Sequence, residues 1–250
     1  MTRQSWSRMG AWAMTVGLLA ISTGCSGTAG GGIKLFNGQD LTGWTTRHED
    51  RLGNAWQSAA AVSVDPDNSR QFIITPGTGI LVNGPTGKTC DIISVQEFGD
   101  CELHVEWVVP EGSNSGVYFM GEYEIQILDS YGKDKVTFSD AGGIYARWIN
   151  EQNVEGHPPR VNAARAPGQW QSFDVVFRAP RFDVTGKKIE NARFVSVRHN
   201  GKLIHENVSL NGPTRGGLTG VEKPRGPIML QGDHGPVAFR NLRVKPLDKE

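Results

Sequence analysis

The sequence predicts a mostly β protein, a jelly-roll β-sandwich of two antiparallel sheets with long loops. No stretch after Gly32 keeps a 3.6-residue apolar period over three turns, whereas two-residue alternation recurs along the chain. The 250 residues include 32 Gly and 13 Pro, an excess that indicates many turns. A chain with about ten short strands cannot form one open sheet without curling, so we expect two packed sheets.

The expected strands follow the alternating segments in chain order. They are Phe72–Thr75, Ile80–Val82, Glu102–Val109, Gly116–Phe119, Tyr123–Leu128, Ser172–Arg178, Arg193–His199, Lys202–Asn207, Ile228–Gln231 and Ala238–Lys245. The motif His199-Asn200-Gly201-Lys202 predicts a hairpin, because Asn-Gly accepts the two positive φ angles of a type I′ turn. Long loops are expected at 130–169 and 211–226, and loops of this length often form lids or binding edges.

The N-terminal segment has the pattern of an export signal. Arg3 and Arg8 precede an apolar run over residues 11–21, no acidic residue occurs before Gly24, and the run is too short to span a bilayer. We therefore assign residues 1–24 to a signal peptide that is not part of the fold.

The sequence around the expected cleavage point resembles a bacterial lipoprotein signal. In Ser22-Thr23-Gly24-Cys25, small residues precede a cysteine, and the resemblance implies lipidation of Cys25 and anchoring in the periplasm or cell envelope. Ser22 stands where that pattern has an aliphatic residue, so ordinary cleavage and release stays open. Residues 25–32 are small and predict a flexible tether, and residues 33–250 a single domain.

Charge and cysteine content narrow the class of partner and the redox state. The 26 basic and 26 acidic residues balance and no run of Lys or Arg occurs, which argues against a nucleic-acid groove. With Cys25 assigned to the signal, Cys90 and Cys101 remain. In an oxidising compartment they can form one disulfide, and the alternative is two buried thiols.

Two expected strands carry ionisable residues on one face. In the first strand, Leu103, Val105 and Trp107 alternate with Glu102, His104 and Glu106. In the second, Tyr123, Ile125 and Ile127 alternate with Glu122, Glu124 and Gln126. A solvated outer face explains each strand alone. Together with Asp129 they offer acids, bases and hydrogen-bonding groups for a polyhydroxylated ligand.

A set of ordered motifs covers nearly the whole expected domain. They are Phe36–Trp44 (FNGQDLTGW), Phe98–Leu103 (FGDCEL) running into Glu106-Trp107, Asn114–Phe119 (NSGVYF), Tyr123–Asp129 (YEIQILD), Gly226–Gln231 (GPIMLQ), His234-Gly235 and Phe239–Leu242 (FRNL). Together they resemble the 3-keto-disaccharide hydrolase domain. The resemblance implies a fold similar to concanavalin A-like lectins and glucanases, and cleavage of a glycosidic bond in a sugar oxidised to a ketone at C3.

The chemistry of such a substrate indicates which groups the site needs. A ketone at C3 acidifies the proton on C2, so a base can remove it and the group on C1 then leaves by elimination, after which water can add back. This route needs a base, an acid and a group that stabilises the enolate. Direct hydrolysis stays open.

Candidate site residues come from the motifs and the strand faces. The expected catalytic residues are Glu124, Asp129, Glu106 and His234. The expected substrate-binding residues are Gln126, Asn114, His104, Trp148, Gln231 and Arg240. Trp148, in the long loop, is the candidate for stacking on a sugar ring.

Other functions remain open from the sequence. A non-catalytic, lectin-like carbohydrate-binding module on the cell surface uses the same polar face, and an adhesion or scaffold domain needs an exposed apolar patch instead. The carboxylates with His234 also suit a divalent cation, although no sequential metal motif is present. Catalysis requires these groups to converge on one pocket, whereas scattering over several faces argues against it.

Overall fold

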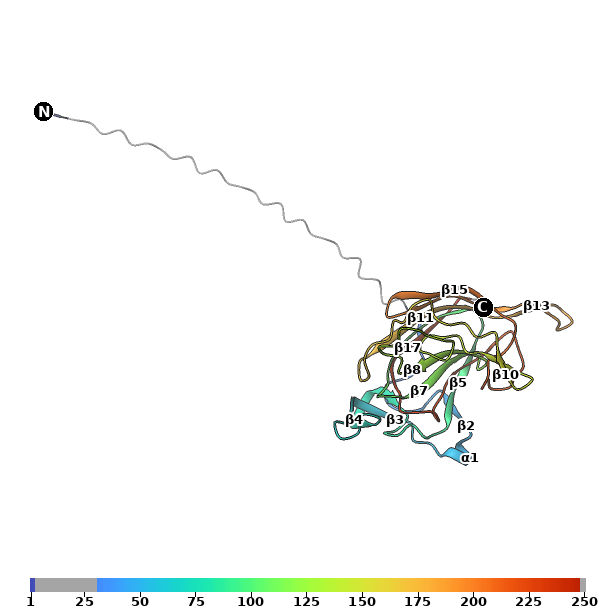
Figure 1. Cartoon of the computed structure of the whole chain (residues 1–250), viewed down its shortest axis with the longest axis horizontal. Coiled ribbons are helices and arrows are strands. Elements are labelled where there is room, and N and C mark those ends of the chain that lie inside the picture. The colour runs from blue at the N-terminus through green and yellow to red at the C-terminus, as the bar shows by residue number, and fades with distance from the viewer. Residues whose placement is uncertain (3–30, 248–250) are drawn as a thin grey trace. The chain divides into compact units, whose positions relative to one another are not determined.

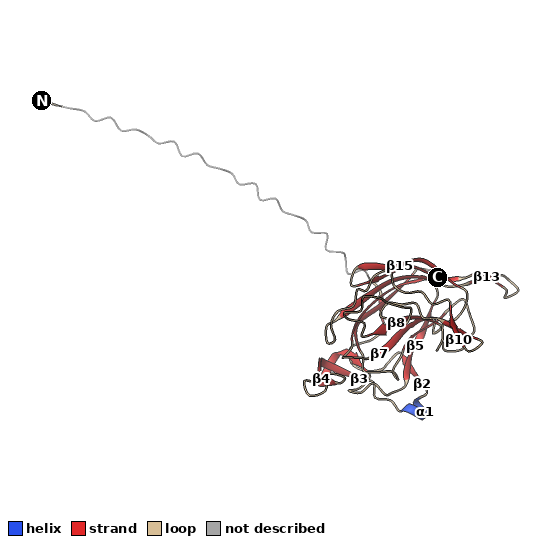
Figure 2. Ribbon diagram, viewed as in Figure 1, coloured by secondary structure: helices blue, strands red, loops and turns tan. Residues whose placement is uncertain are grey.

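Antiparallel sheets make up almost all of the regular structure in the computed structural model, which describes residues 1–2 and 31–247 (Figures 1 and 2). The described residues from 31 to 247 belong to one compact unit. Residues 3–24 of the predicted signal peptide and Cys25 lie outside the described residues, as does most of the predicted tether. Within the described part of the chain, no helix has the length and apolar character that a membrane crossing requires.

The larger sheet forms one layer of the sandwich. Its strands are ordered β15 (Lys202–Leu210), β14 (Ala192–His199), β11 (Gln171–Arg178), β6 (Cys101–Val108), β17 (Ala238–Pro246), β4 (Phe72–Val82) and β3 (Gln57–Val64), and β1 (Ile33–Lys34) also pairs with β17. Each pair is antiparallel. The sheet therefore brings strands far apart in sequence side by side, as a jelly roll requires.

The smaller sheet forms the second layer and carries the site described below. Its order is β2 (Trp44–Arg47), β5 (Asp91–Phe98), β16 (Gly226–Leu230), β7 (Asn114–Phe119) and β8 (Tyr123–Leu128). Outside the two sheets lie the ribbons β9 (Arg147–Ile149) with β10 (Gln152–Val154) and β12 (Arg181–Phe182) with β13 (Lys188–Glu190), and the four-residue helix α1 (Glu49–Leu52). The predicted sandwich of two antiparallel sheets is confirmed.

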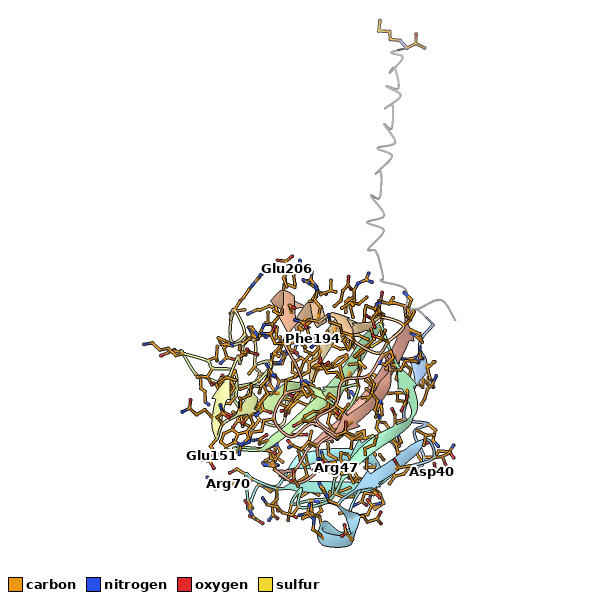
Figure 3. The ribbon with its side chains drawn as sticks, turned by 90° about the vertical axis from the view of Figure 1, so that its right-hand side faces the viewer. Asp40, Arg47, Arg70, Glu151, Phe194 and Glu206 are labelled. Atoms are coloured by element: carbon orange, nitrogen blue, oxygen red, sulfur yellow. The ribbon has the colours of Figure 1, made fainter. Side chains whose placement is uncertain are left out.

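The core lies between the sheets, where the apolar side of each alternating strand is buried. In β6, Leu103, Val105 and Trp107 are buried while the residues between them are half-buried. The rings of Phe119 from β7 and Phe194 from β14, the latter labelled in Figure 3, meet edge to face at 5.2 Å between centroids. This contact joins the two sheets, because one ring comes from each.

The predicted hairpin is confirmed in its details. His199 pairs with Lys202, and Asn200 and Gly201 have φ angles of 51° and 78°. Both values are positive, as the type I′ turn demands.

One strand is longer than the alternation predicted. The expected strands Phe72–Thr75 and Ile80–Val82 are the two ends of the single strand β4, which shifts register against Ala59 of β3. Gly77 lies in that irregular part, with φ at 150°, and an added Cβ there would come within 2.5 Å of the Ala60 side chain. The backbone of the two strands approaches closely here because Gly77 has no side chain.

The two cysteines are not bonded to each other, so the disulfide considered from the sequence is wrong. Cys90 precedes β5 of the smaller sheet, whereas Cys101 begins β6 of the larger sheet, and both side chains are buried. The eight residues of β5 lie between them, a span of roughly 25 Å at about 3.3 Å per residue. A disulfide needs Cα atoms within about 7 Å. Burial raises the pKa of the Cys90 thiol.

Candidate active site

Two cross-strand rows of side chains face outward from the smaller sheet. One row runs Thr45, Ile93, Met229, Tyr118 and Glu124, as the pairing of neighbouring strands shows. The next row contains Arg47 opposite Asp91, and Gly116 opposite Gln126. The backbone N–H of Gln231 donates to the Gly116 carbonyl, which places Gln231 beside Gly116 in that row. The sheet register thus assembles a polar surface from all five strands.

The long loop after β8 covers one side of this polar surface. Ile144 bridges to Ile125, and the Tyr145 N–H donates to the Glu124 carbonyl, so the loop continues the sheet beyond its edge. The sequence alternation over β8 correctly predicted which residues face the core, but Glu124 and Gln126 on the other face are buried as well. These two polar side chains are therefore removed from water by a loop, not by the core.

The loop before β16 covers the other side. Arg47, labelled in Figure 3, donates from Nη1 to the Gly216 carbonyl at 3.0 Å and from Nη2 to the Gly217 carbonyl at 3.2 Å. The buried Glu122 accepts from the N–H and hydroxyl of Thr219 and from the Gly220 N–H. These bonds fix the loop against the strands.

The sheet and the two loops enclose a polar pocket of about 260 Å³. It is lined by Asn114, Tyr118, Glu124, Gln126, Tyr145, Arg215, Gly216, Gln231 and His234. Pockets for drug-sized ligands span about 300–1,000 Å³, so this one suits a single small ring such as a monosaccharide. Five of the predicted site residues meet here: Glu124, His234, Gln126, Asn114 and Gln231.

Glu124 is the titratable group at the bottom of the pocket. Its side chain is 2% exposed, and burial raises the pKa of its carboxyl to about 8. The Tyr118 hydroxyl donates to the carboxylate and opposes the rise in pKa, whereas the charges of Asp91 and Asp233 add to it. A buried carboxyl with a pKa near working pH can both hold and release a proton, which is the requirement for proton transfer in catalysis.

His234 supplies a second proton-transfer group at the mouth of the pocket. Its Nδ1 is hydrogen-bonded to the Asp233 carboxylate, and its side chain is half exposed. The hydrogen bond to Asp233 raises the pKa of His234 above its ordinary value, against a smaller opposing effect of burial. Since Nδ1 is held by Asp233, Nε2 is the ring nitrogen left to act on a ligand.

Gln126 has a fixed orientation. Its Nε2 donates to the Ser139 carbonyl at 3.2 Å, and this bond identifies which end of the amide is nitrogen, because the reverse would place two oxygens together. The Oε1 atom is buried and has no hydrogen-bond partner among the described residues. An unpaired buried acceptor is costly, and a ligand that donates to it removes that cost.

Arg215 was missed by the sequence analysis, because its loop has no alternation that indicates a direction for its side chains. Its backbone N–H donates to the Ala146 carbonyl, and its guanidinium lies 3.9 Å from the ring centroid of Trp148. Arg215 thus covers one face of the Trp148 ring, and Trp148, which was predicted to stack on a sugar, does not line the pocket. The tryptophan orients a cation at the pocket instead.

The other ionisable strand face is on the opposite side of the sandwich, so Glu106, His104 and Arg240 do not join the pocket. Glu106 accepts from Arg240 Nε at 2.6 Å and from Asn241, and His104 Nδ1 lies 2.6 Å from the Asp174 carboxylate. The guanidinium of Arg240 also lies 4.1 Å from the Trp170 ring centroid. The predicted convergence of these three residues with Glu124 is wrong, because strand alternation does not reveal which sheet a strand joins.

Asp129 also lies outside the pocket. Its Oδ2 accepts from the Gly112 N–H at 3.0 Å, and its Oδ1 from the Tyr131 N–H at 3.3 Å. The carboxylate therefore holds the turns on either side of it, as Asp often does in loops.

A larger hollow of about 410 Å³ lies beside the same loop, lined among others by Leu218, Glu222 and Arg225. The carboxylates of Glu122 and Glu222 already have partners. Glu122 is bonded to the loop backbone, and Glu222 accepts from the Tyr123 hydroxyl at 2.6 Å and pairs with Lys188 at 2.5 Å. The pocket that contains Glu124 is the better candidate because its polar groups still face a ligand.

In the part of the chain that the structure describes, no three His, Cys, Asp or Glu side chains are placed to hold a metal ion together. The predicted set of Glu106, Glu124, Asp129 and His234 is divided among different places in the fold. That set does not form a cation site, and its scattering argues against catalysis by the four groups together. Two of the four, Glu124 and His234, do share one pocket.

The fold and the pocket define a class: a β-sandwich protein with a polar, titratable pocket on its smaller sheet. The chain belongs to the family of the 3-keto-alpha-glucoside-1,2-lyase-like domain, whose sequence model matches residues 31–245. This agrees with the resemblance of the motifs.

Individual relatives support the same assignment. A 3-keto-disaccharide hydrolase of Bacteroides thetaiotaomicron is 30% identical over 106 residues, which cover 42% of this chain and 32% of the relative. The match thus spans about a third of that protein's length. A Parabacteroides distasonis structure described as a glycosyl hydrolase has 29% identity and a TM-score of 0.61, over 86% of this chain and 84% of the other. Another from that organism, with 18% identity, has a TM-score of 0.55 over 87% and 100% of the two chains and shows the shared fold.

Proposed function

We propose that the chain is an exported enzyme that cleaves 3-keto-glycosides or 3-keto-disaccharides by removing the C2 proton and eliminating the group on C1. The observation that carries the proposal is Glu124, a carboxyl buried in a pocket the size of one sugar ring and with a pKa of about 8. The family description, which names a lyase acting on 3-keto-alpha-glucosides, supports the same reaction type.

The reaction balances with the groups that line the pocket. The Glu124 carboxylate takes the proton from C2, and the electron pair forms a C2=C3 enolate with negative charge on the C3 oxygen. The enolate then re-forms the ketone, a C1=C2 double bond appears, and the C1–O bond breaks with its electrons on the departing oxygen. A protonated His234 gives that oxygen a proton. Addition of water across C1=C2 completes a net hydrolysis.

The remaining lining residues fit the needs of this route. Arg215 is the cation at the pocket and stabilises the charge that develops on the enolate oxygen. Arg240, which the sequence analysis expected to bind the substrate, lies on the other sheet. The amides of Asn114, Gln126 and Gln231 orient the sugar hydroxyls, as in other polar ligand sites.

The number of carboxylates favours elimination over direct hydrolysis. Glycosidases that hydrolyse directly mostly use a pair of carboxyl groups that flank the bond. Among the described residues that line the pocket, Glu124 is the one carboxylate. Asp91 and Asp233 are near enough to influence its pKa, but Asp91 is bonded to the Gly232 N–H and Asp233 to His234.

The direct test is to incubate the protein with 3-keto-trehalose or a 3-keto-glucoside, with and without a chelator, and to follow sugar release. Unoxidised glycosides are the control. We expect release from the keto sugars alone, because the C2 proton is acidic only beside a ketone. Binding without release would instead assign the chain to the lectin-like, non-catalytic class.

Export and anchoring form a separate part of the proposal, supported by the signal pattern of residues 1–24 and by Cys25. The proposed location is the periplasm or cell envelope, with a lipid on Cys25. Labelled palmitate should be incorporated into the wild type and not into Cys25→Ser. Equal labelling of both would contradict the anchor and leave the proposed reaction untouched.

A further inference from the structure

Gly116 is the one position without a side chain between Gln231 and Gln126 in the second outward row of the smaller sheet. It lies in the middle of β7, opposite Gln126 of β8. Glu124 is two residues from Gln126 on the same strand and projects from the same face. The row therefore has a gap directly beside the carboxyl that we assign to proton transfer.

The Glu124 carboxyl lies over this gap. A Cβ added to Gly116 would come within 2.2 Å of Glu124 Oε1 and within 3.0 Å of both Glu124 Cδ and Tyr118 Cε2. Nonbonded carbon atoms approach favourably only to about 3.5–4.0 Å. A single methyl group thus cannot share the space with the carboxyl.

Nothing in the local backbone calls for glycine. Gly116 is not among the residues with positive φ, and glycine inside a strand gives up side-chain packing and conformational restriction. Its neighbours on β7 are Ser115 and Val117, which pair normally across the sheet. The contact of Gly116 with Glu124 and Tyr118 accounts for a residue that strand formation alone disfavours.

We propose that Gly116 is a positioning residue, whose missing side chain provides the slot that holds the Glu124 carboxyl against β7 beside the Tyr118 hydroxyl. The inference rests on the proposed function for the importance of Glu124. In this slot the carboxyl is enclosed by strand backbone, the Tyr118 ring and the covering loop, and the rest of the pocket stays open for the sugar. Gly116 acts only through the Glu124 carboxyl that it contacts, and it is not among the residues that line the pocket.

Gly116→Ala should turn the carboxyl out of the slot and into the pocket. There it loses the Tyr118 hydrogen bond, takes up space meant for the sugar and gains contact with water. We expect kcat/KM to fall about 100-fold, the effect of misplacing a reacting group by an ångström. We also expect the acid limb of the pH profile to move to lower pH, because a hydrated carboxyl has a lower pKa.

A second-site variant separates positioning from general damage to the strand. Asp is one methylene shorter than Glu, so Gly116→Ala with Glu124→Asp places a smaller acid beside the new methyl. We expect this double variant to be more active than Gly116→Ala, whereas Glu124→Asp alone is less active than wild type. Gly31→Ala is the matched control, because a Cβ at Gly31 has no atom within 4 Å.

The titration of Glu124, followed by NMR of carboxyl groups labelled with ¹³C in glutamate, tests the slot without any substrate. Glu124→Gln assigns the signal. A downward shift of the Glu124 pKa in Gly116→Ala, with thermal unfolding still cooperative, supports the proposal even if no keto sugar is cleaved. An unchanged titration with kcat/KM within twofold of wild type overturns it, and so does a double variant no more active than Gly116→Ala.

Discussion

At the scale of single residues, the buried carboxyl of Glu124 that we assign to proton transfer also makes the stability of the fold depend on pH. Burial raises its pKa in the folded state to about 8, above the ordinary value of 4.5 that applies in the unfolded chain. Between these two values the folded state binds the proton more tightly. The stabilising contribution of the protonated carboxyl is therefore complete below about pH 4.5 and is lost as the pH rises through about 8.

Replacing Glu124 by Gln should make the protein more resistant to alkaline conditions. Gln keeps the shape of the protonated acid but cannot ionise, so it avoids the cost of a buried charge. We expect the midpoint of urea unfolding to match wild type near pH 5 and to exceed it at pH 9. A midpoint of urea unfolding lower in Glu124→Gln than in wild type at pH 9 would show that the ionised carboxylate does not destabilise the folded protein.

The location of a residue in the pocket could be predicted from sequence where alternation and motif agreed. Glu124 and Gln126 were identified from the face of one strand, and His234 from a motif after another strand. The prediction that Glu106 lies in the pocket was wrong, because the same alternation occurs on a strand of the other sheet. Tyr118 and Arg215 had no signal, since Tyr118 is a tyrosine in an apolar segment and Arg215 is one of many loop charges.

At the scale of elements, the loop over residues 211–225 depends on Glu122 at the start of β8. Its carboxylate receives the Thr219 N–H, the Thr219 hydroxyl and the Gly220 N–H. Hydrogen bonds to a charged group contribute about 1.5–3 kcal/mol each, so these three bonds stabilise the loop against the sheet.

Glu122→Ala should free this loop and with it the wall of the pocket. We expect a lower melting temperature, a KM raised by several-fold and a lower kcat, because the loop carries Arg215, the proposed stabiliser of the enolate. Glu206→Ala is the control, since Glu206 makes an exposed ion pair with Arg160. If the two variants have the same KM, the loop does not depend on Glu122.

Strands were predictable where alternation was regular and turn residues bounded it. The strand β3 (Gln57–Val64) was missed because three consecutive alanines interrupt the pattern, and it lies at the edge of its sheet with mostly exposed side chains. In β5 (Asp91–Phe98) the adjacent Ile92 and Ile93 break the alternation. β3 forms through pairing with the next strand, β4, and β5 through pairing with β2 and with the distant β16. Local propensity does not report such pairing.

At the scale of the whole molecule, two buried histidines make the fold sensitive to acid. Burial lowers the pKa of His199 to about 3 and that of His205 to about 4. His205 donates from Nε2 to the Gly142 carbonyl at 2.7 Å and so ties β15 to the loop that covers the pocket. The nearby His157 and Arg160 add to its reluctance to gain a proton.

The sign of the effect follows from proton binding. Between about pH 6.5 and the folded pKa values, His199 and His205 bind protons in the unfolded chain and not in the folded protein. The free energy of unfolding therefore decreases as the pH is lowered through that window. For His205 the shift corresponds to roughly 3 kcal/mol. His104 and His234 have raised pKa values and act in the opposite sense, but both are partly exposed and screened by solvent.

We expect His205→Gln to lose less stability than wild type between pH 7 and pH 4.5. Gln can still donate to the Gly142 carbonyl but cannot gain a charge. Urea unfolding at both pH values measures the difference. If wild type and His205→Gln lose equal amounts of stability between the two pH values, the acid sensitivity comes from groups other than His205.

The central claim is that Glu124 removes the C2 proton of a 3-keto-glycoside, and hydrogen exchange at C2 tests it most directly. The substrate is incubated in D₂O with wild type and with Glu124→Gln, and deuterium at C2 of recovered substrate is measured beside sugar release. We predict deuterium in substrate recovered from wild type, and in Glu124→Gln loss of exchange together with a ~10²- to 10⁴-fold slower release. His234→Ala should retain exchange while release slows. Full cleavage by Glu124→Gln, with no deuterium at C2 in wild type, would contradict the account.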